Sequence, residues 1–164
     1  WDDTENAEIK MIQNHKIFWL YARASGPATE YKLRNYAIAS FLLTYDPNYA
    51  ILQEIFKTAH SFPVMPETGL VPLQPVTTAS NVSGYARSGG TFMREFRTCY
   101  YRGVNKGACA VVVNPSSYSR PIPTTAYAHS MVLSGSGVLD GGTVSFSGAR
   151  PSSLASGSGV ILFH

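Results

Sequence analysis

The sequence predicts an α+β fold in which a helix–strand–helix segment is followed by an antiparallel β-sandwich. Residues 1–60 combine helical spacing of apolar residues with one long aromatic-rich run, whereas residues 68–164 consist of short apolar runs separated by Gly, Ser and Asn. Charged side chains nearly vanish at the end of the chain, because residues 111–164 contain only Arg120, Asp140 and Arg150. We therefore expect two units in these 164 residues, residues 1–67 and residues 68–164.

The first unit is predicted to contain a helix, a strand and a second helix. Acidic residues crowd the start of the segment 3–13 and Lys10 stands near its end, which suits a helix dipole. The aromatic-rich run 16–22 predicts a strand buried on both faces. Helical spacing predicts a second helix over 29–43, and residues 48–57 fit either a strand or a short helix. This order of elements is typical of α/β barrels and doubly wound sheets.

The second unit is predicted to be all β. A linker or surface loop over 62–75 holds four prolines and one glycine. Beyond it, residues 91–97 alternate with a period of two, and Asp140 begins a tight-turn signal with two glycines. Regular short strands between turns are typical of an antiparallel sandwich. The predicted strands cover 91–100, 108–114, 129–133, 143–146 and 160–163.

Composition excludes several classes of protein. The net charge is only +3 and the basic residues are scattered, so we expect no nucleic-acid partner. No apolar stretch approaches the roughly 18 residues that a membrane span needs. The four histidines show no ligand spacing, and no phosphate-binding glycine loop occurs, so neither a metal nor a cofactor is predicted.

The two cysteines predict a disulfide. Cys99 and Cys109 flank a glycine-containing loop between two predicted strands, and a hairpin there brings their Cβ atoms within bonding range. A pair of free thiols and a metal site are the alternatives. The bridge favours a secreted or cell-surface protein. Asn81 begins an Asn-Val-Ser glycosylation motif, which is short enough to occur by chance.

The sequence contains no catalytic motif. Gly-x-Ser-x-Gly is absent, and the ten carboxylates are spread too thinly for a catalytic pair to be chosen by spacing. We interpret the early acids, Asp2, Asp3, Glu5 and Glu8, as helix-capping residues, with a metal-binding or catalytic pair at Asp2 and Asp3 as the alternative. The abundant tyrosines predict either sugar-stacking platforms or ordinary packing.

Four motifs in one order resemble the C-terminal part of glycoside hydrolase-like proteins that combine a (β/α)8 barrel with a C-terminal β-sandwich. They are residues 34–43 (RNYAIASFLL), 69–75 (GLVPLQP), 93–96 (MREF) and 110–116 (AVVVNPS), followed by similar sequence at 135–142 and 158–163. Gln74 departs from the family pattern, which usually has glycine there, and so does the cysteine-bounded insertion.

The resemblance implies that the first unit is a helix–strand–helix remnant of a (β/α)8 barrel. A full barrel takes about 250 residues, so strands that carry catalytic acids are missing. Barrel sites lie at the carboxyl ends of strands, which implies substrate contacts from Tyr21, Arg23, Tyr45 and Asp46. The alternative is that these four are turn and loop residues.

The function expected from these arguments is that of the C-terminal portion of a secreted glycoside hydrolase-like protein. It would support the barrel and bind an oligosaccharide or polysaccharide, without a complete active site of its own. Its partners would be a chain that supplies the missing N-terminal barrel or further copies of itself. The alternative function is that of a non-catalytic extracellular structural or assembly protein.

Overall fold

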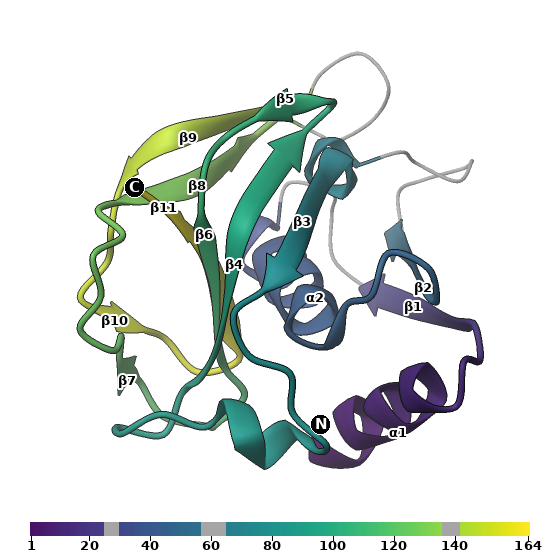
Figure 1. Cartoon of the computed structure of the whole chain (residues 1–164). Coiled ribbons are helices and arrows are strands. Elements are labelled where there is room, and N and C mark those ends of the chain that lie inside the picture. Colours follow the sequence, from purple (N-terminus) through teal and green to yellow (C-terminus); the bar gives the residue numbers. More distant parts are fainter. Residues whose placement is uncertain (25–29, 57–64, 136–141) are drawn as a thin grey trace.

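The structure is a computed structural model that describes residues 1–24, 30–56, 65–135 and 142–164. A seven-stranded sheet dominates it, α2 lies against one face of that sheet, and the parallel pair β1–β2 lies beyond α2 (Figure 1). The helices are α1 (Asp2–Gln13), α2 (Tyr31–Thr44), η1 (Pro66–Gly69) and η2 (Val82–Tyr85). The strands are β1 (Phe18–Ala24), β2 (Ala50–Phe56), β3 (Leu70–Pro75), β4 (Phe92–Tyr101), β5 (Val104–Asn105), β6 (Cys109–Asn114), β7 (Arg120–Pro121), β8 (His129–Ser134), β9 (Thr143–Ala149), β10 (Ser153–Leu154) and β11 (Ser158–Phe163).

The fold class expected from the sequence is wrong. The described residues form a mainly β protein with two α-helices, and the large sheet, in the order β3-β4-β6-β11-β8-β9 with β5 beside β4, pairs its strands antiparallel throughout. The first segment is not a barrel remnant, because α2 packs on β11 and β6 of this sheet. Local periodicity identified the elements correctly, but it carries no information about which sheet a helix covers.

Most individual elements lie where the sequence predicts them. The predicted helices 3–13 and 29–43 correspond to α1 and α2, and the ambiguous segment 48–57 contains β2. The linker predicted over 62–75 is an exception, because its last six residues form β3 at the edge of the large sheet. The start of the tight turn predicted at Asp140 lies outside the described residues.

The two faces of the large sheet support two hydrophobic clusters. Cys109, Val111 and Val113 of β6 face α2, while Ala110 and Val112 face the opposite way. The opposite face is covered by the short pair β7–β10 and adjacent loops, which gives the sandwich-like layering expected for the second half. Because every β6 side chain is buried, this strand lacks the polar alternation of a half-exposed strand.

The cluster between α2 and the sheet joins both halves of the chain. Phe18, Phe41 and Leu42 are buried there with β6 and β11, and Leu20 packs against them, as the apolar pattern predicts. Gly159 of β11 allows the close approach of α2, since a Cβ added there would lie 2.5 Å from the Cβ of Ala39. The division into units 1–67 and 68–164 remains a prediction about independent folding.

The disulfide prediction is confirmed. Cys99 of β4 and Cys109 of β6 are bonded, their Cα atoms lie 6.0 Å apart, and both side chains are fully buried. Backbone hydrogen bonds from the Cys99 amide to the Gly107 carbonyl and from the Lys106 amide to the Cys99 carbonyl close the loop between them.

Candidate functional site

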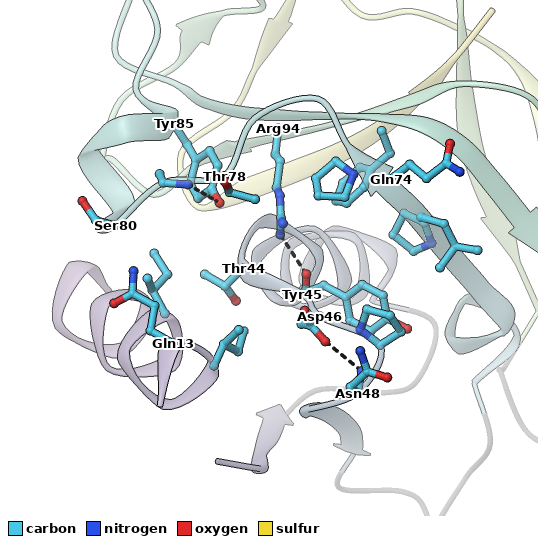
Figure 2. A pocket seen from close by; sticks show the side chains of 18 residues that line it. Gln13, Thr44, Tyr45, Asp46, Asn48, Gln74, Thr78, Ser80, Tyr85 and Arg94 are labelled. Carbon is cyan, nitrogen blue, oxygen red and sulfur yellow. Dashed lines mark hydrogen bonds between the residues drawn. The ribbon is translucent and has the colours of Figure 1, made fainter. Parts of the chain in front are cut away.

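A pocket of about 640 Å³ lies between α1, the turn after α2, strand β3 and the segment that leads into η2. Gln13 approaches it from α1, Arg94 from the large sheet and Asn48 from the turn before β2 (Figure 2). Its polar and tyrosine lining consists of Gln13, Thr44, Tyr45, Asp46, Asn48, Gln74, Thr78, Ser80, Tyr85 and Arg94. The remaining lining residues are prolines, aliphatic side chains and Phe96, so the pocket combines uncharged polar groups with an apolar surface.

Arg94 organises the wall of the pocket formed by the large sheet. Its Nη1 donates hydrogen bonds to the carbonyl oxygens of Leu43 and Tyr45, at 3.1 and 2.9 Å, where α2 ends. The last turn of α2 has no basic residue of its own, so Arg94 supplies the positive charge that stabilises a helix C-terminus. Burial lowers the pKa of Arg94, while Tyr85 and Asp46 act in the opposite direction. This role of Arg94 escaped the sequence argument, because 49 residues separate it from Tyr45.

Tyr45 and Asp46, two of the four predicted contact residues, lie together in the pocket. The ring of Tyr45 packs on Phe41 with centroids 5.3 Å apart, and burial raises the pKa of its phenol. The carboxylate of Asp46 accepts a hydrogen bond of 2.8 Å from the backbone amide of Asn48, so Asp46 shapes the turn before β2. Asp46 thus also has the turn role that the sequence offered as the alternative.

Tyr21 is not among the described residues that line this pocket. Tyr21 lies on β1, where its ring stacks on Trp19 with centroids 5.2 Å apart and planes 17° apart. Both rings are more than half exposed. The prediction that this strand is buried on both faces is therefore wrong. The side chain of Arg23 lies outside the described residues. Substrate contact by these four residues stays a prediction.

Asn81 is exposed at the start of η2, where its side-chain oxygen accepts a hydrogen bond from the hydroxyl of Ser83. The motif is therefore accessible, and glycosylation at Asn81 stays a prediction.

Two acids of α1 do not have the capping role expected of them. Glu5 and Glu8 are buried against α2, and Thr44 donates a hydrogen bond of 2.6 Å to Glu8. Burial raises the pKa of Glu5 to about 9, with the charge of Glu8 as the second cause, and raises the pKa of Glu8 to about 7. The dipole argument fails for this pair because their face of α1 is buried. Glu5 and Glu8 are three residues apart and so share one face of the helix, and this spacing was the signal in the sequence that could have revealed their burial.

Acidic groups are scarce in the pocket. Among the described residues that line it, Asp46 is the only carboxylate, whereas glycoside hydrolysis ordinarily requires two. No group of three or more His, Cys, Asp or Glu side chains that could hold a metal occurs in the described ranges. No described helix is long and apolar enough to cross a membrane.

Comparison with known proteins identifies no relative: no family model, no curated protein and no solved structure matches the chain.

Proposed function

We propose that this protein is a non-catalytic carbohydrate-binding domain that takes a neutral oligosaccharide in the pocket between α1 and β3. The observation that carries the proposal is the lining of uncharged amides and hydroxyls beside the half-buried ring of Tyr45. Such groups hydrogen-bond sugar hydroxyls, and aromatic faces pack on the apolar faces of sugar rings. The resemblance to the C-terminal part of glycoside hydrolase-like proteins supports the same class of ligand.

The two charged groups of the pocket favour a neutral ligand. Arg94 is engaged with the carbonyl oxygens at the end of α2, and Asp46 is engaged with the amide of Asn48. An ionic ligand would have to compete with these internal contacts. Uncharged side chains such as Gln13 and Gln74 remain available for recognition.

The disulfide supports an extracellular setting for this function. Intramolecular disulfides persist in oxidising compartments, and here one joins two central strands. We propose that the protein is secreted or displayed at a cell surface, where polysaccharides are accessible.

Isothermal titration against neutral gluco-, xylo- and manno-oligosaccharides tests the proposal. We expect binding by at least one series, and a loss of at least tenfold in affinity in the variant Gln13→Ala/Asn48→Ala, which removes two exposed side chains at the pocket. Tyr118→Ala is the matched control, because Tyr118 is an exposed tyrosine outside the pocket. Absence of binding at millimolar sugar, or equal loss in the control, would contradict the proposal.

A second candidate function, that of an assembly protein, is favoured by the exposed face of β1–β2. Ile17, Trp19, Tyr21 and Ile51 are each at least 47% exposed, and in the described part of the chain β1 and β2 pair only with each other. Unpaired edges and apolar faces promote association. Light scattering coupled to size-exclusion chromatography should then show oligomers. Trp19→Lys should disperse them, whereas Val104→Lys, at another exposed apolar position, should leave them intact. A monomer at high concentration removes self-association as its function.

A further inference from the structure

The interface between α1 and α2 is polar along one stripe. The α2 side of the stripe carries hydroxyl groups spaced four residues apart, on Tyr36, Ser40 and Thr44. The indole Nε1 of Trp1 donates to the hydroxyl of Ser40 at 3.1 Å, and the Thr44 hydroxyl donates to Glu8 Oε2 at 2.6 Å. Burial and the charge of Glu5 together raise the pKa of Tyr36. The groups that α2 places along this stripe are therefore hydroxyls and not cations.

Glu5 and Glu8 stand three residues apart on the buried face of α1, with 2% and 5% of their surface exposed. Glu5 Oε2 and Glu8 Oε1 have no hydrogen-bond partner among the described residues. An ionised carboxylate in such a place loses hydration worth several kcal/mol without a compensating contact. Both carboxyls are therefore expected to hold a proton while the two helices are packed together.

The surrounding charges do little to stabilise the ionised forms. On α1, Asp2 and Glu8 disfavour ionisation of Glu5, and the α-amino group of Trp1 is the only cation that acts on it among the described residues. Thr44 is the only group of α2 that favours ionised Glu8. Of the other elements packed on α1, η2 contributes Tyr85, which lies beside Arg94.

Strand β1 also contacts α1, and its titratable residues are Tyr21 and Arg23. The side chain of Tyr21 is exposed, and that of Arg23 is outside the described residues.

The same helix forms one wall of the pocket. Ile9, Ile12 and Gln13 line it, and the side-chain oxygen of Asn6, on the same helix, accepts a hydrogen bond of 2.8 Å from the backbone amide of Val82 at the start of η2. Movement of α1 away from α2 would therefore change the shape of the pocket.

We propose that α1 is a proton-controlled wall of the pocket: it stays packed on α2 while Glu5 and Glu8 are protonated, and it separates when they ionise. The pocket is then closed on this side in mildly acidic solution and opens as the pH rises. The inference concerns the protein without ligand, so it stands or falls independently of the proposed carbohydrate binding.

Hydrogen exchange of the α1 amides, corrected for the intrinsic pH dependence of exchange, measures this separation. Each proton held only in the packed state changes the equilibrium by up to about tenfold per pH unit. We expect the opening equilibrium of α1 to rise at least tenfold between pH 6 and pH 8. Amides of β6 and β11 serve as the internal reference, because these strands lie in the centre of the sheet.

The variant Glu5→Gln/Glu8→Gln should abolish the pH dependence and keep α1 protected at pH 8. Asp3→Asn is the matched control, since Asp3 is an exposed acid of the same helix, and it should retain the full dependence. Equal protection of α1 in the parent protein at pH 6 and pH 8 would overturn the proposal, even if the double variant did not fold. So would an unchanged dependence in a folded double variant.

Discussion

At the scale of single residues, the most buried charges are Arg34 and Glu67. The Nε and Nη2 atoms of Arg34 donate to the two carboxylate oxygens of Glu67 at 2.7 and 2.6 Å, and neither side chain is exposed. Arg34 also donates to the carbonyl of Gly135 at 3.3 Å. This pair links α2 to η1, directly before β3, so it determines how the chain enters the large sheet.

Removal of one partner of this pair leaves a buried charge. We expect Glu67→Gln to lower the free energy of unfolding by about 3–5 kcal/mol, as is typical for a broken buried ion pair. The double variant Arg34→Met/Glu67→Met should lose less than the sum of Arg34→Met and Glu67→Met, because it leaves no orphaned charge. Urea unfolding compares the four variants with the parent protein, and a loss below 1 kcal/mol for Glu67→Gln would contradict this account.

The disulfide is the second prediction at this scale. Closing the loop between Cys99 and Cys109, which are ten positions apart, stabilises the fold by roughly 2–3 kcal/mol through the entropy of the unfolded chain. Cys99→Ala/Cys109→Ala should lower the urea midpoint accordingly. Because both cysteines are fully buried, the folded parent should also resist a mild reductant that cleaves the bond in urea. Rapid reduction of the folded protein would show that this part of the sheet opens readily.

At the scale of elements, the close contact of α2 with β11 holds the helical layer on the sheet. A continuous stretch of α2 from Ile38 to Thr44 is buried, because the sheet covers one side and α1, β1 and β2 contact the helix as well. This explains why apolar residues occur on several sides of α2 and not along a single stripe.

Gly159 provides a test of that contact. In Gly159→Ala the added Cβ would lie 2.5 Å from Ala39 Cβ and 3.0 Å from the carbonyl oxygen of Asn35. Helix and sheet must then separate slightly, at a cost of about 1–3 kcal/mol. Gly107→Ala is a useful contrast, since nothing lies within 4 Å of its Cβ and only the positive φ of 81° opposes the change. Thermal unfolding compares the two, and Ala39→Gly should partly restore the stability of Gly159→Ala.

At the scale of the whole molecule, the buried acids of α1 predict how stability depends on pH. The pKa values of Glu5 and Glu8 rise from 4.5 to about 9 and about 7 on folding, so the folded state binds more protons than the unfolded state between these limits. Stability therefore decreases as the pH rises from about 5 to about 9, by up to about 1.4 kcal/mol per pH unit for each retained proton.

Urea unfolding between pH 5 and pH 9 measures this slope. Glu5→Gln should flatten it across the range, and Glu8→Gln should flatten it mainly below pH 7. A stability that increases from pH 5 to pH 9 in the parent protein would contradict the burial of these carboxyls.

The order of local elements could be predicted from the sequence, because each depends on neighbouring residues. The helix at 31–44, the aromatic strand at 18–24 and the bonded cysteines follow from periodicity, composition and loop length. The site could be predicted only in part: Tyr45 and Asp46 lie in the pocket, whereas Tyr21 lies on another surface.

Only the tertiary structure decided which surfaces meet. α2 covers an antiparallel sheet instead of a barrel. Arg94 donates hydrogen bonds to the C-terminal end of this helix although it is 49 positions from Tyr45 in the sequence. Glu67 pairs with Arg34, which is 33 positions away. The spacing of residues along a chain reports which side chains share a face of one helix or strand. It does not report which distant face buries them, because that choice depends on the packing of the whole chain.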